Sequence, residues 1–345
     1  MMNRIILILI VAFSFTRCID PINLLTSENA KTMLVIDAKI SKYKDNGKIS
    51  VDLIQSSLDT RRSFGFIADE VAVLNGAGNK LILNRTEIGR YSANETSLFK
   101  FTYGEKYKVR VAITGGDTYE SAFSELNQAP VISTAGFKYS GIAKDKTTNL
   151  VVSINTTISS NLKNKILKWD VIKTYQITEQ PFGGPPGKIC YVTTKEDIRE
   201  VRTLDGRKIE NNKPFDFIIT EKLVNHEYAE GTYFTIVQEA IDVNTQNYFI
   251  AYNNLVQREG NIFETPPGPL PTNFKCITDT TKLVTGYFYA SQQDSARIFI
   301  SPSAVGAPER LCPKPPNEAS DCPFYQCCNC INVKGSSRVK PPFWR

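Results

Sequence analysis

This chain of 345 residues contains a single histidine, His226. His226 lies in the polar run Asn225-His226-Glu227, which is typical of a surface loop. A catalytic triad or a histidine metal site would need this one imidazole, and the chain has no G-x-S-x-G or H-E-x-x-H motif. We therefore predict no catalytic residue, no bound metal and no other cofactor.

Phosphate-binding and nucleic-acid-binding signals are also missing. Gly76-Ala77-Gly78 is an isolated G-x-G that follows Asn75, a pattern more typical of a hairpin turn than of a phosphate cradle. The 41 basic residues are interspersed with 35 acidic ones, so the net charge of +6 forms no basic stripe. We predict no nucleic-acid partner.

The chain lacks a long apolar run, and its longest one lies at the N-terminus. Arg4 precedes nine apolar residues, Ile5 to Phe13. As a helix they rise about 14 Å, which is too short for a bilayer core of about 30 Å. This pattern is typical of an export signal, which we place at residues 1–17.

Cys18 follows at the position where lipoprotein signals are cut, although Arg17 stands where a small residue is usual. We predict that Cys18 is acylated and that membrane lipid holds the mature chain, with residues 18–31 as a tether. The alternative is ordinary cleavage that leaves Cys18 as a thiol.

After the tether the sequence changes to period two, which indicates strands. Leu34, Ile36, Ala38 and Ile40 alternate with more polar residues, and Lys106 to Ile113 repeats the pattern. Gly115-Gly116-Asp117 then marks a hairpin turn. We predict an immunoglobulin-like or prealbumin-like antiparallel β-sandwich over residues 32–128.

Residues 129–301 are expected to form a second β-rich domain with one helix. Its strands include one on which Trp169 shares a face with Leu167 and Val171, so Trp169 is a candidate structural anchor. Apolar residues at Tyr248, Tyr252, Leu255 and Val256 then follow helical spacing. With Asp242 or Asn244 as a cap, the helix should cover about 242–259 and pack on a sheet.

Residues 302–345 have little periodicity and are expected to pack on the second domain as a cysteine-rich tail. Disulfides are the default in an exported protein, and they order a segment that buries little apolar surface. The seven candidates are Cys190, Cys276, Cys312, Cys322, Cys327, Cys328 and Cys330. Because seven is odd, at least one thiol must be free or pair with another chain.

A zinc site is the rival interpretation of these cysteines. Cys327 and Cys330 form one C-x-x-C pair, but no second pair exists to complete a four-cysteine site. At the end of the tail, Phe343 and Trp344 are candidate anchors that would hold it by aromatic burial.

The C-terminal residues resemble the ending of a known family. Cys327-Cys328-Asn329-Cys330, Gly335 and Lys340-Pro341-Pro342-Phe343-Trp344 are similar to the ending of Bacteroidota outer-membrane lipoproteins that are catalogued as a domain of unknown function. Leu34 to Ile40 and Gly286-Tyr287-Phe288-Tyr289-Ala290-Ser291 resemble two of its strands. The similar segments keep the family's order along nearly the whole mature chain.

The resemblance implies an outer-membrane location, on the periplasmic or the cell-surface side, and an accessory role beside a TonB-dependent receptor. We therefore expect a binding or scaffold protein rather than an enzyme, with exposed aromatics such as Tyr103 and Tyr139 as candidate contacts. The alternative is a surface hydrolase of glycan or peptide.

We predict that Cys18→Ser releases the protein into the soluble fraction or leaves an uncleaved precursor, because the acylated cysteine is the proposed anchor. Membrane fractionation and the size of the chain on a gel measure this. A Cys18→Ser protein that stays with membranes at the mature size, as wild type does, would contradict the prediction.

Overall fold

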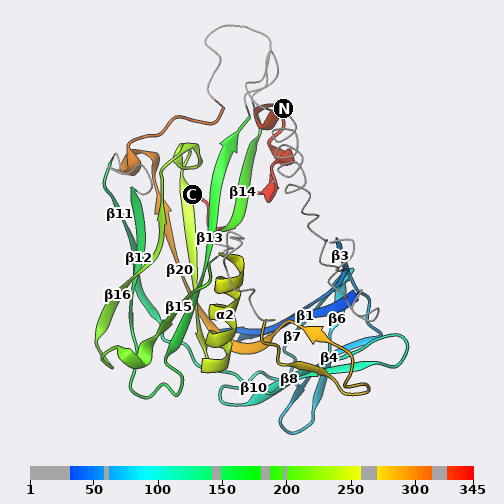
Figure 1. Ribbon diagram of the computed structural model, residues 1–345. Coiled ribbons are helices and arrows are strands. Elements are labelled where there is room, and N and C mark those ends of the chain that lie inside the picture. Colours follow the sequence, from blue (N-terminus) through cyan, green and yellow to red (C-terminus); the bar gives the residue numbers. More distant parts are fainter. Residues whose placement is uncertain are drawn as a thin grey trace, which may run out of the picture.

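The fold is mainly β, as the period-two patterns predict, and Figure 1 shows it as a computed structural model. The structure describes residues 32–57, 62–141, 149–179, 187–196, 200–257, 270–312 and 325–345. Cys18 and Cys322 lie outside the described residues. Within them, no helix is long and apolar enough to cross a membrane.

The first half of the chain forms two layers around one core. One layer contains β1 (Thr32–Tyr43), β2 (Asn46–Ser57), β3 (Arg62–Gly65), β6 (Asn84–Glu87) and β7 (Arg90–Asn94). The other layer contains β4 (Glu70–Asn75), β5 (Lys80–Ile82), β8 (Lys106–Ala112), β9 (Thr118–Ser121) and β10 (Ser124–Glu125). Tyr107, Val109 and Val111 of β8 are buried between the layers, as their alternation predicts.

The chain returns to this sandwich more than 100 residues later. β18 (Phe274–Cys276) pairs with β9, and β19 (Val284–Thr285) and the start of β20 (Phe288–Ile300) pair parallel to β1. Phe274, Val284 and Phe288 are part of its core. The sandwich expected from residues 32–128 thus also contains residues 274–290, because a period-two pattern reports the buried face and not the neighbouring strand.

The second half has its own core between two sheets. One sheet contains β13 (Ile166–Thr178), β14 (Ile189–Glu196), β15 (Arg202–Asp205) and β17 (Thr232–Ile241). The other contains β11 (Ile132–Tyr139), β12 (Leu150–Thr157) and β16 (Pro214–Lys222). Trp169 is buried here: its indole nitrogen donates to Gln238 Oε1 at 2.8 Å, and its ring stacks on Phe217 at 4.3 Å between centroids.

β20 joins the two halves into one bent sheet. Its first residues pair with β1, and the stretch Gln293–Ile300 pairs antiparallel with β17. In Figure 1 the strands beside β13 stand upright while β1 runs across the base, so the sheet has an inner corner.

The helix α2 (Val243–Val256) lies in this corner (Figure 1). Of the two predicted caps it is Asp242 that caps the helix, by accepting from the Thr245 N–H at 2.7 Å. Tyr248 and Phe249 pack on the sheet, but Leu255 of the predicted stripe is exposed. The helix therefore rests on the sheet through its central turns and leaves its end free of the core.

The tail is fixed to β14 by disulfides. Cys190 of β14 bonds to Cys330, and Cys312 bonds to Cys327. Cys328 at the end of α3 (Tyr325–Cys328) is disulfide-bonded as well. Disulfide formation in the C-terminal segment is thus confirmed. The prediction that Cys276 forms a disulfide is wrong. Cys276 is a buried free thiol, because β18 places it in the first core, whereas the tail cysteines belong to another core.

Aromatic rings hold the last residues of the tail. β21 (Ser336–Ser337) pairs with β14, and beyond it the Trp344 ring packs edge-on against Tyr191 at 4.9 Å. Trp344 and Phe343 both contact Tyr233. The short 3-10 helices complete the described chain: η2 (Gly206–Lys208), η3 (His226–Tyr228), η4 (Pro302–Val305) and η5 (Cys330–Asn332).

We predict that Gly286→Ala destabilises the protein by about 2–4 kcal/mol. Gly286 has a φ of +102°, and an added Cβ would lie 2.2 Å from the carbonyl oxygen of Ile36, where β20 meets β1. Urea denaturation followed by circular dichroism measures the loss. The control is Gly136→Ala, where an added Cβ meets nothing within 4 Å; equal midpoints for the two variants would show the prediction to be wrong.

Candidate functional site

The inner corner of the bent sheet contains a cleft of about 370 Å³, which we call the corner cleft. It lies where the outer face of β1 and β2 meets β13 and α2. Strands β14, β15 and β16 also contribute to its walls. Segments from the start, middle and end of the chain therefore meet at this site.

A buried carboxylate, Glu239 of β17, holds the floor of the cleft together. Its side chain has no solvent exposure. It pairs with Lys39 of β1 and, at 3.0 Å, with Lys168 of β13. The hydroxyl of Tyr289 donates to it at 3.2 Å, and the Gln293 amide donates at 2.5 Å. Charged groups from both halves of the molecule therefore share one carboxylate.

Lys168 extends the network to the rim of the cleft. Its ammonium also lies 2.6 Å from Asp170 Oδ2, and the other oxygen of Asp170 is 2.9 Å from Lys195 Nζ. The Lys168 side chain is almost fully buried, whereas that of Lys195 is about half exposed. The ion-pair network thus runs from the interior to solvent.

Pairing keeps these groups charged. Burial alone would raise the pKa of Glu239, but the ammonium groups of Lys168 and Lys39 outweigh it and lower the pKa to about 2. The pKa of Asp170 is also held well below its usual range, with Lys168 as its main partner. Burial alone would lower the pKa of Lys168, yet Glu239 and its other anionic neighbours raise it well above normal. The ion pairs therefore favour the ammonium form of Lys168.

Aromatic rings form the wall on the side of α2. Tyr248 stacks on Tyr287 with centroids 4.5 Å apart, and Phe249 meets Tyr289 edge-on at 5.7 Å. The ammonium of Lys168 lies 5.2 Å from the centre of the Phe249 ring. The ring faces and charges are therefore interleaved along the cleft.

Two carboxylates form the opposite wall. Asp37 of β1 and Asp52 of β2 are directly opposite each other in the strand register, and both are exposed to the cleft. Desolvation by the surrounding protein raises the pKa of Asp37. The hydrogen bond from the Tyr287 N–H lowers this pKa, and the charge of Asp52 raises it.

The residues that the sequence singled out lie elsewhere. His226 begins η3, and neither it nor Tyr103 nor Tyr139 lines the cleft. Of the three anchors only Trp169 reaches the lining. Sequence reasoning missed Lys39, Lys168 and Glu239. The available signal was a charged residue flanked by apolar ones within a strand, as in Leu167-Lys168-Trp169.

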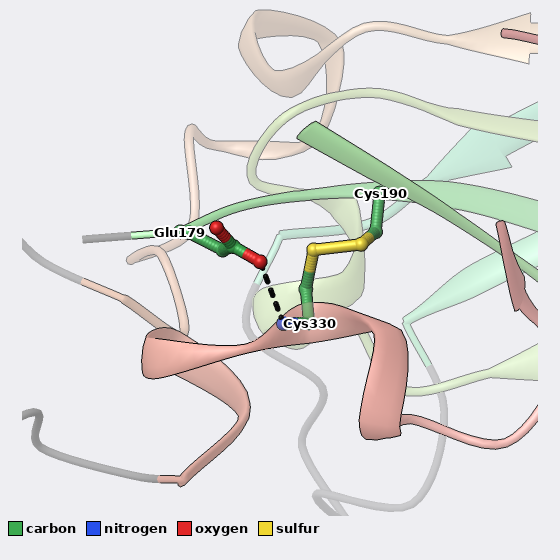
Figure 2. Close-up of side chains that lie close together, drawn as sticks. All are labelled: Glu179, Cys190 and Cys330. Atoms are coloured by element: carbon green, nitrogen blue, oxygen red, sulfur yellow. Dashed lines mark hydrogen bonds between the residues drawn. A yellow bond between two sulfur atoms is a disulfide. The ribbon is translucent and has the colours of Figure 1, made fainter. Parts of the chain in front are cut away.

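One further cluster contains three residues of types that can bind a metal ion. Glu179, Cys190 and Cys330 are buried, and Figure 2 shows their side chains close together. The two cysteines are joined as a disulfide and offer no thiolate, while Glu179 accepts from the Cys330 N–H at 3.0 Å. This cluster fixes the tail to β14 and is not a metal centre in its oxidised form.

Comparison with known proteins identifies a family and includes a weak structural likeness. A family model described as "Domain of unknown function (DUF4249)" matches residues 19–297. A search of curated proteins finds no match. Among solved structures, a DUF4785 family protein from Legionella pneumophila has 9% sequence identity and a TM-score of 0.18, over 58% of this chain and 49% of that one. This chain thus spans about half the length of that protein, and the likeness carries no argument.

We predict that Glu239→Gln costs about 3–5 kcal/mol at neutral pH, because it leaves the buried ammonium of Lys168 and the partly buried ammonium of Lys39 without their shared carboxylate. In wild type, the stabilisation from Glu239 is complete above its ordinary pKa of 4.5 and is lost as pH falls toward about 2. The free energy of unfolding, measured with denaturant at several pH values, should fall across that window less steeply in the variant.

The control is Glu210→Gln, which removes an exposed ion pair with Lys213 and should cost less than about 1 kcal/mol. Equal losses in both variants, or an unchanged acid slope in Glu239→Gln, would contradict the assignment of Glu239.

Proposed function

This chain belongs to the family described as Domain of unknown function (DUF4249), and from that premise we propose that it is a lipid-anchored binding protein that uses the corner cleft. The observation that carries the proposal is the construction of the cleft: ring faces and charged groups line an open concavity whose floor is fixed by buried ion pairs. Concave sites with an aromatic lining and a few placed polar groups are typical of binding sites.

We further propose that the protein is anchored in the outer membrane through acylated Cys18 and serves as an accessory of a TonB-dependent receptor. Support comes from the export signal and from the resemblance of the chain's motifs to outer-membrane lipoproteins. The described fold begins at Thr32, so residues 18–31 would separate it from the lipid.

A binding role also agrees with the electrostatics of the cleft. The ion pairs raise the pKa of Lys168 and Lys39 and lower the pKa of Asp170 and Glu239, so they favour the charged form of all four groups. A fixed charge pattern suits recognition of a ligand or partner.

The alternative function, hydrolysis of glycan or peptide, rests on one specific observation. Asp37 and Asp52 form a carboxylate pair in the cleft, and the pKa of Asp37 is raised. Pairs of carboxylates with separated pKa values can supply a general acid and a base.

We predict that the tagged protein, captured from native membranes, brings down a TonB-dependent receptor. Asp52→Arg should reduce the yield of that receptor several-fold, because it places a long cation at the mouth of the cleft. Quantitative mass spectrometry provides the measurement. Asp45→Arg, on the exposed β1–β2 turn outside the cleft, is the matched control and should capture as wild type does.

Two results would overturn this function. One is the absence of any such receptor from wild-type captures, or equal capture by Asp52→Arg. The other is turnover of a glycan or peptide by the purified protein that is lost in Asp37→Asn, which would establish the hydrolase.

A further inference from the structure

The acidic wall of the corner cleft breaks a rule of strand pairing. Like charges directly opposite each other on neighbouring strands are destabilising, yet Asp37 and Asp52 occupy such positions. The guanidinium of Arg90 lies 3.6 Å from Asp52, but both side chains are more than half exposed. Within the described residues, Asp37 accepts a hydrogen bond only from the Tyr287 N–H, at 3.3 Å, and no cation pairs with it. In the described part of the chain, the wall therefore carries one carboxylate, Asp37, that has no cationic partner, beside Asp52, whose ion pair with Arg90 is open to solvent.

Ring faces lie beside this charge. The stacked rings of Tyr248 and Tyr287 adjoin Asp37. Burial is the main cause that raises the pKa of Tyr248, and the charge of Asp37 is the next. Tyr252, one turn further along α2, also lines the cleft. An aromatic face carries the negative part of the ring quadrupole, so it attracts cations as a carboxylate does.

At the floor of the same cleft, a carboxylate and aromatic rings together hold ammonium groups. There the ring of Tyr289 lies 5.5 Å from the Lys39 ammonium and that of Phe249 lies 5.2 Å from the Lys168 ammonium. Both lysines pair with the Glu239 carboxylate. The floor is thus a carboxylate-and-ring site filled by the chain's own ammonium groups. The acidic wall repeats its elements, carboxylates and stacked rings, without an internal ammonium.

From this parallel we propose that the corner cleft binds an organic ammonium group between Asp37, Asp52 and the rings of Tyr248 and Tyr287. The inference rests on the proposed binding function and names the chemistry of its ligand. A quaternary ammonium of the choline type and a primary ammonium of a lysine side chain share this chemistry. The cleft volume of about 370 Å³ accommodates either group.

Calorimetric titration of the purified full-length protein tests the proposal with four probes. These are choline, its neutral isostere 3,3-dimethylbutan-1-ol, N-acetyl-lysine methylamide and calcium chloride. We expect choline or the lysine derivative to bind and the neutral isostere to bind at least about tenfold more weakly, because only the charge differs. The probe that binds more tightly identifies the source of the ammonium group.

Variants locate the site. Asp37→Asn and Asp52→Asn should each weaken ammonium binding about tenfold, while Asp45→Asn, outside the cleft, leaves it unchanged. Equal affinity for choline and its isostere, an unchanged affinity in both cleft variants, or binding of calcium alone would overturn the proposal. The titration contains no partner protein, so its failure is separate from a failed capture of the receptor.

Discussion

The shared carboxylate of Glu239 is the interaction on which the arrangement of the molecule depends. It is fully buried, and its two ammonium partners come from β1 of the first sandwich and β13 of the second. Taking these charges out of water is costly, and their mutual attraction offsets that cost only while the geometry is kept. The same ion pairs therefore set the position of β1 relative to β13, and with it the shape of the corner cleft.

The parts of the fold that sequence could predict are those set by local pattern. The alternation in β8 predicted its buried face, and the polar residues before α2 predicted a cap that Asp242 provides. The cluster of cysteines in the tail predicted disulfides, which the structure contains. Each of these depends on neighbours in the chain or on residue chemistry alone. The resemblance to a domain of unknown function was likewise readable from motifs, and a family model of that description matches residues 19–297.

The candidate site could not be predicted, because it is built from pairings distant in sequence. Lys39 alternates with apolar residues as a solvent-facing side chain would, and it does lie on the outer face of its sheet. That face becomes the wall of a cleft only because α2 and β13 are brought against it. Nothing local to Lys39, Lys168 or Glu239 indicates that the three meet. For the same reason, Cys276 looked like a partner for the tail until its strand was placed beside β9.

The parallel pairing of β1 with β20 also has a consequence for how the chain is made. Asp37 and the Tyr287 N–H that it accepts from are 250 residues apart. At about 5–20 residues per second of synthesis, roughly 12–50 s separate the appearance of the two segments. During that interval β1 can pair with β2 on one side, while its other side remains an open edge, the kind of edge on which chains aggregate. The nascent N-terminal half thus depends on protection from other chains until nearly the whole polypeptide has emerged.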